Sequence, residues 1–90
     1  MTNKDLNGQV AWVTGGGTGI GLETVRALAR AGAVVVVSGR RQSELDAAVS
    51  AAREAGGAAH ALALDVSDAQ AVTAATARIV ADHGRIDMLV

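Results

Sequence analysis

The stretch "VTGGGTGIGLE", residues 13–23, decides the fold, because it joins an apolar run to an amphipathic one through a cluster of glycines. Five of the chain's eleven glycines lie in this stretch. Each glycine costs about 0.5–1 kcal/mol relative to alanine inside a regular element, so the cluster needs a physical reason. A strand that turns sharply into a helix presents the helix's free N–H groups and positive dipole end at the sheet edge. The stretch therefore predicts an anion site made of backbone.

The residues on either side of the glycines alternate between strand and helix patterns. Apolar runs predict strands at 9–14, 33–38, 60–64 and 86–90, and stripes with a 3.6-residue period predict helices at 19–31 and 43–55. A capping box of Ser67 and Gln70 is expected to open a third helix, which ends at His83-Gly84. The order β-α-β-α-β-α-β with short connections predicts an α/β fold, a doubly wound parallel sheet with right-handed crossovers.

Composition narrows the functional classes. Half of the 90 residues are hydrophobic, 19% are charged and the net charge is −1, which argues against disorder and against nucleic acid as a partner. The chain has no cysteine, which excludes disulfides and thiolate metal sites and favours a reducing compartment. Its longest aliphatic run, residues 33–37, is too short to span a bilayer. We expect a cytoplasmic protein with no membrane partner.

The spacing of the glycines shows which kind of phosphate-binding loop this stretch resembles. A Walker loop needs a lysine after its last glycine, and none follows here. Thr14-Gly15-x-x-x-Gly19-Ile20-Gly21 instead resembles the cofactor motif of the short-chain dehydrogenases/reductases, in their smaller, non-extended branch. The resemblance extends through "LNGQVAWVTGG" at 6–16, "LDVSD" at 64–68 and "GRIDMLV" at 84–90. It implies a Rossmann-type fold and cofactor contacts at Gly15, Thr18, Gly19, Ile20 and Gly21. The alternative is a flexible turn that binds nothing.

The residues after the second strand bear on the choice of cofactor. In dinucleotide folds an acid roughly 20 residues after the glycines receives the ribose hydroxyls. Gly39 stands there, and Arg40 and Arg41 follow. Two cations before a helix N-terminus oppose its dipole unless an anion is bound, and a 2′-phosphate is such an anion. By resemblance, Arg40 marks a preference for NADP(H), with NAD(H) as the alternative. Many NADP(H)-preferring relatives also carry a basic residue where this chain has Thr18. Solvated surface charge is the other interpretation of both arginines.

Other polar residues receive smaller roles. Asp65 and Val66 resemble the pair that contacts adenine in this family, although Asp65 could instead only help to start the third helix. We expect Asp87 to support local backbone. Because His60 and His83 have no partners at ligand spacing along the sequence, no metal site is expected.

The family's catalytic residues have no counterparts in this sequence. By resemblance, hydride transfer needs a Tyr with a Lys four positions later, helped by a Ser and an Asn. The chain has no Tyr, and its only Lys is Lys4. Since the fourth strand pattern stops almost where it starts, we expect residues 1–90 to be the N-terminal half of a longer dinucleotide-binding domain. We expect the complete protein to be an NADP(H)-dependent alcohol/carbonyl oxidoreductase and a homo-oligomer. The 90 residues alone are expected to supply the ADP-ribose site and to be catalytically inactive. The alternative is a non-catalytic dinucleotide-binding or interaction fragment.

Overall fold

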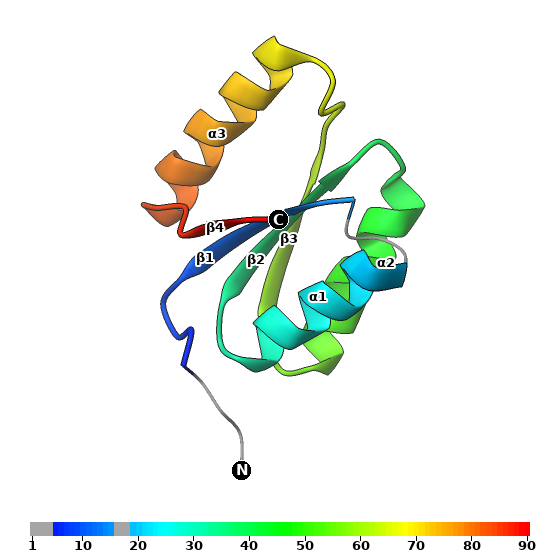
Figure 1. Ribbon diagram of the computed structural model, residues 1–90, viewed down its shortest axis with the longest axis vertical. Helices are drawn as coiled ribbons and strands as arrows, with labels where there is room; N and C mark the ends of the chain where they lie inside the picture. The colour runs from blue at the N-terminus through cyan, green and yellow to red at the C-terminus, as the bar shows by residue number, and fades with distance from the viewer. Residues whose placement is uncertain (1–4, 16–18) are drawn as a thin grey trace.

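The computed structural model describes residues 5–15 and 19–90. They form four parallel strands and three helices: β1 (Val10–Thr14), α1 (Gly19–Arg30), β2 (Val34–Gly39), α2 (Gln42–Glu54), β3 (Ala58–Ala63), α3 (Ala69–His83) and β4 (Met88–Leu89) (Figure 1). The order of strands in the sheet is β3-β2-β1-β4. The predicted doubly wound α/β fold is thus confirmed. The strand order reverses at β1, and in such sheets the reversal marks where ligands bind.

Two apolar layers hold the helices on opposite faces of the sheet. Helices α1 and α2 cover one face and α3 covers the other (Figure 1). Successive β2 residues point alternately into the two layers: Val35 and Val37 pack with α1 and α2, whereas Val36 packs toward α3. This explains why residues 33–38 form a continuous apolar run, since the strand is buried on both sides.

The strand boundaries differ from the prediction by one residue in β1 and β2 and by up to two residues in β3 and β4. β3 begins at Ala58, two residues before the predicted start, because its pairing with β2 begins at Val34 opposite Ala58. The ladder of β4 with β1 contains Met88 and Leu89, fewer residues than predicted, and backbone hydrogen bonds to β1 flank it at Asp87 and Val90. Alanine-rich and terminal strands have weak sequence patterns, so hydrogen bonding to the neighbouring strand sets their limits. Within the described residues, no helix has the length and apolarity needed to cross a membrane.

The predicted cap of α3 is wrong by one residue. Asp68, not Ser67, is the N-cap: its Oδ1 accepts hydrogen bonds from the backbone N–H groups of Gln70 (3.0 Å) and Ala71 (3.2 Å). The hydroxyl of Ser67 donates instead to Asp65. The helix ends as expected, with His83 in the last turn and Gly84 in the left-handed conformation at φ 84°.

Candidate functional site

The ends of three neighbouring strands bring most of the predicted contacts to one edge of the sheet. Gly15 follows β1, Arg40 follows β2, and Asp65 lies two residues beyond β3. The register places Thr14 opposite Ser38 and Gly39 opposite Ala63, so these chain ends lie side by side. We call this edge the carboxyl edge.

The turn after β1 needs glycine for its backbone conformation. Gly15 has φ 68° and Gly19 has φ 54°, both in the left-handed region that other residues rarely adopt. A Cβ at either position would meet no atom within 4 Å, so conformation and not space requires glycine there. The N–H of Gly15 donates to the carbonyl of Ser38 over 2.9 Å, which fixes the start of the turn against β2. Thr18 lies outside the described residues.

The N-terminus of α1 opens onto the same edge. Gly19 is exposed, Gly21 is half-buried, and 87% of the Ile20 surface is accessible. No acidic side chain lies in the first turn of α1, all of whose residues are described, so no carboxylate of that turn competes for its N–H groups. An anion placed there would face the backbone N–H groups of the first helical turn and the positive end of the helix dipole.

The two arginines after β2 differ in their partners. Arg41 forms an ion pair with Glu44 at 3.6 Å between Nη1 and Oε1. Arg40 is exposed, and among residues 5–15 and 19–90 it belongs to no ion pair. A Cβ at Gly39 would lie 3.6 Å from the Leu45 side chain, an ordinary contact, so the glycine there is not required by space. Arg40 is thus the arginine that remains available to an added anion.

Asp65 is held as a charged acceptor. Its Oδ1 accepts from the Ser67 hydroxyl over 2.7 Å and from the Ser67 backbone N–H over 2.9 Å. These hydrogen bonds lower the pKa of Asp65 below its usual value against an opposing effect of burial, and the positive charge of Arg40 adds a smaller lowering. Val66, beside it, is 54% exposed although apolar. An anionic acceptor next to an uncovered apolar side chain suits a flat, partly polar ligand.

Ser38, which no sequence pattern indicated as a site residue, organises this edge. Its side chain is fully buried and accepts a 2.8 Å hydrogen bond from the indole N–H of Trp12, while its carbonyl holds Gly15. A single serine at the end of an apolar strand is the only signal that the sequence offers. Asp87, by contrast, behaves as expected: its Oδ2 accepts from the Val10 N–H over 2.8 Å, at the opposite end of β1.

The fold also joins two histidines that no sequence spacing links. The rings of His60 and His83 lie with their centroids 5.1 Å apart. Among the described residues, no group of three or more His, Cys, Asp or Glu is arranged to hold a metal ion.

The parallel sheet, with its glycine turn and open helix N-terminus at the switch point, defines a dinucleotide-binding class of fold. Residues 9–90 match the family described as short chain dehydrogenase, and the chain belongs to that family. The chain is 51% identical over 81 residues to the short-chain reductase protein NovJ of Streptomyces niveus, covering 90% of this chain and 31% of NovJ. It is 45% identical over 83 residues to the short-chain dehydrogenase/reductase homolog YusS of Bacillus subtilis, covering 91% of this chain and 76% of YusS.

Solved structures agree with this assignment. A metagenomic short-chain oxidoreductase in complex with NADP superposes with a TM-score of 0.91 at 41% identity, covering 94% of this chain and 38% of that one. An NAD⁺-bound xylitol dehydrogenase superposes with a TM-score of 0.90 at 36% identity, covering 96% of this chain and 33% of the dehydrogenase. The chain spans about a third of the length of NovJ and of these two structures.

Proposed function

We propose that the protein is an NADP(H)-dependent oxidoreductase that interconverts an alcohol and a carbonyl compound, and that this chain supplies its ADP-ribose site. The observation that carries the proposal is Arg40, an arginine near Asp65 that has no ion-pair partner among the described residues. It directly follows Gly39, the position at which an acid would select NAD(H). A guanidinium group binds a phosphate monoester through charge-assisted hydrogen bonds. NADP(H) carries such a phosphate on its adenosine ribose, and NAD(H) does not.

Each part of the carboxyl edge has a role in this proposal. The free N–H groups of α1, with Gly15, Thr18, Gly19, Ile20 and Gly21, hold the pyrophosphate. Arg40 holds the 2′-phosphate. Asp65 accepts from the adenine amino group through an oxygen other than its Ser67-bound Oδ1, and Val66 packs against the base. The nicotinamide of the bound cofactor supplies or accepts the hydride, and this chain offers no Tyr–Lys pair for the accompanying proton transfer.

The comparisons support the reaction class and leave both cofactors open. One matched structure is described with NADP and another with NAD⁺, so the shared fold accommodates either dinucleotide. The arginine at position 40 is what favours NADP(H) in this chain. We further propose that the reaction is catalysed by a longer, homo-oligomeric polypeptide in the cytoplasm and that the 90 residues alone are inactive.

The cofactor assignment is tested by two matched substitutions. Arg40→Gln should weaken NADPH binding about 10- to 100-fold, because a charge-assisted hydrogen bond contributes about 1.5–3 kcal/mol, and should change NADH binding much less. Arg41→Gln is the control, since Arg41 is already paired with Glu44. Gly39→Asp combined with Arg40→Gln should then reverse the preference from NADPH to NADH. The fold has room for the Cβ of the new aspartate, which would make only an ordinary contact with Leu45. Calorimetric titration of the wild type and the three variants with NADPH and with NADH measures the affinities. An unchanged NADPH-to-NADH ratio in every variant would contradict the proposal.

The alternative is a module that binds the dinucleotide without chemistry, because the described residues contain a binding edge and no reaction centre. Turnover of a panel of alcohols and aldehydes by the protein at its full natural length separates the two functions. Cofactor-dependent turnover supports the oxidoreductase, whereas tight NADPH binding with no turnover supports the module.

A further inference from the structure

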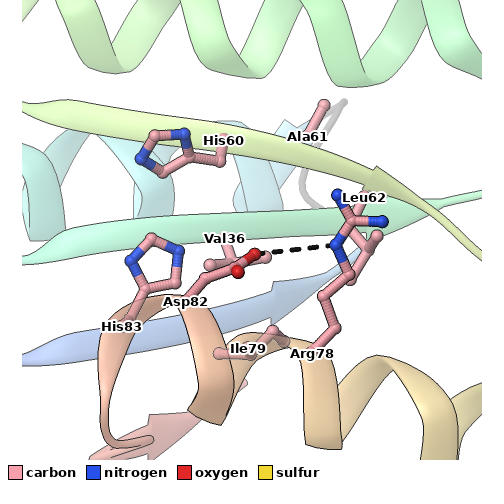
Figure 2. A pocket seen from close by; sticks show the side chains of 8 residues that line it. All are labelled: Val36, His60, Ala61, Leu62, Arg78, Ile79, Asp82 and His83. Atoms are coloured by element: carbon pink, nitrogen blue, oxygen red, sulfur yellow. Dashed lines mark ion pairs between the residues drawn. The ribbon is translucent and has the colours of Figure 1, made fainter.

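A cavity of about 370 Å³ lies between α3 and the sheet (Figure 2). Its apolar wall comes from Val36, Leu62 and Ile79, and its polar side chains include two histidines. His60 lies in the first half of β3, and His83 is the last residue of α3. None of the residues that line this cavity is a predicted cofactor contact, so the histidines are not part of the proposed cofactor site.

The two histidines reach the cavity from different elements. Figure 2 shows the ring of His60 projecting from β3 and the ring of His83 from the end of α3, one facing the other across the cavity. Their centroids are 5.1 Å apart and their planes are inclined by 39°. His60 is exposed and His83 is half-buried, so an ion in solution can reach both rings.

This separation suits a shared metal ion. A zinc-bound imidazole nitrogen lies about 2 Å from the metal and about 1.2 Å from its ring centre, so two imidazoles at a tetrahedral angle have centroids roughly 5 Å apart. The final torsion of a histidine side chain is broad, so each ring can turn a nitrogen toward a common point without backbone movement. We propose that His60 and His83 together bind one divalent ion of the Zn²⁺ and Cu²⁺ class, with water completing its coordination.

The charged neighbours tune this site. Asp82 lines the same cavity, and its carboxylate offsets the charge of a bound cation. Arg78 also lines the cavity and opposes the cation, although it is paired with Asp82 at 3.6 Å between Nε and Oδ2. Since no third ligand is grouped with the histidines among the described residues, two imidazoles supply all the protein bonds to the ion. Removing the charge of Arg78 should therefore strengthen binding.

Such an ion would join α3 to the sheet. Along its fifteen residues α3 buries only Ala75 and Ile79, so its attachment is light. A ligand that binds the folded arrangement and not the unfolded chain raises the unfolding temperature by mass action. A hundredfold excess of Zn²⁺ over its Kd should raise the Tm by roughly 5 °C or more.

The test uses the purified protein at its full natural length, with any affinity tag removed. Zn²⁺ titration by calorimetry and thermal unfolding with and without Zn²⁺ are compared for the wild type, His60→Gln and His83→Gln. Glu54→Gln, an exposed carboxylate on α2, is the matched control. Circular dichroism checks the fold of each variant, and Cu²⁺ with electron paramagnetic resonance counts the imidazole nitrogens on the ion.

The expected result is one bound ion whose affinity falls at least tenfold in either histidine variant, rises in Arg78→Gln and is unchanged in Glu54→Gln. Two nitrogens should be counted on Cu²⁺, and affinity should fall on acidification because only neutral imidazole binds metal. The proposal is overturned if the wild type binds no ion at this site, if either histidine variant binds as the wild type does, or if only one nitrogen is counted. None of these outcomes depends on NADP(H) binding.

Discussion

The indole Nε1 of Trp12 donates a 2.8 Å hydrogen bond to the hydroxyl of Ser38, and both side chains are buried. The bond joins β1 to β2 on the face that α3 covers. The carbonyl of the same serine accepts from the Gly15 N–H over 2.9 Å. One residue at the end of β2 thus fixes both the core beneath the glycine turn and the turn itself.

This pair predicts a coupled loss of stability. Ser38→Ala leaves the buried indole N–H without an acceptor and should lower the free energy of unfolding by about 1–3 kcal/mol. Trp12→Phe removes the donor and some packing, and the double variant should lose less than the sum of the two single losses. Urea unfolding of all four proteins measures the coupling. Ser50→Ala, an exposed serine on α2, is the control and should change stability by less than about 0.5 kcal/mol. Additive losses would show that the bond contributes nothing.

The regular elements could be predicted because their signals are local. The stripe of Leu45, Ala48, Val49 and Ala52 repeats at helical spacing, and the structure packs it against α1 and the sheet. The apolar run of β2 likewise predicts burial on both faces. Such patterns depend on neighbours in sequence, and the chain's own periodicity determines which side faces the core.

The contacts that cross the sheet could not be predicted. Trp12 and Ser38 are 26 residues apart, and their bond depends on the strand register. The approach of His60 to His83 depends on where α3 ends over β3. Within the candidate site, the resemblance named the contact residues, and the fold gathers Gly15, Arg40 and Asp65 at one edge. The cofactor-binding roles of all eight residues stay predictions: Gly15, Thr18, Gly19, Ile20, Gly21, Arg40, Asp65 and Val66.

The corrected cap of α3 gives a second prediction. Asp68→Ala removes the acceptor of two backbone N–H groups and should lower stability by about 1 kcal/mol. Ser67→Ala should have a smaller effect on stability, because Ser67 donates to Asp65 and caps no helix. It should instead raise the pKa of Asp65, which NMR titration of the carboxyl carbon measures. A larger loss of stability in Ser67→Ala than in Asp68→Ala would show that Ser67 caps α3, as the sequence predicted.

Asp87 predicts a dependence of stability on pH. The hydrogen bond from the Val10 N–H, with those from Arg85, lowers the pKa of Asp87 in the folded protein. A carboxyl with a depressed folded pKa contributes stability above its unfolded pKa of about 3.9, and that contribution is lost as pH falls through the folded value. Stability should therefore decline below about pH 4. The decline should be shallower in Asp87→Asn, as measured by urea unfolding at a series of pH values from about 2 to about 7. If the free energy of unfolding falls with pH equally in the wild type and in Asp87→Asn, protonation of Asp87 does not cause the loss of stability in acid.

Gly57 predicts a loss caused by space and not by conformation. It follows α2 without a positive φ, yet a Cβ there would lie 2.6 Å from the Ala29 Cβ and 2.7 Å from the Ala29 carbonyl oxygen. Because the second of these is a backbone atom in the buried end of α1, the contact cannot be relieved by a rotamer change. Gly57→Ala should lower the free energy of unfolding by about 1–3 kcal/mol.

The control for Gly57→Ala is Gly39→Ala, whose added Cβ meets only the Leu45 side chain at 3.6 Å and should leave stability nearly unchanged. Combining Gly57→Ala with Ala29→Gly removes the Cβ contact and keeps the contact with the carbonyl oxygen, so stability should return only in part. Urea midpoints of the four proteins distinguish these cases. Equal midpoints for Gly57→Ala and the wild type would mean that the loop after α2 moves away from α1 without loss, and that the close approach of the two segments contributes nothing to the fold.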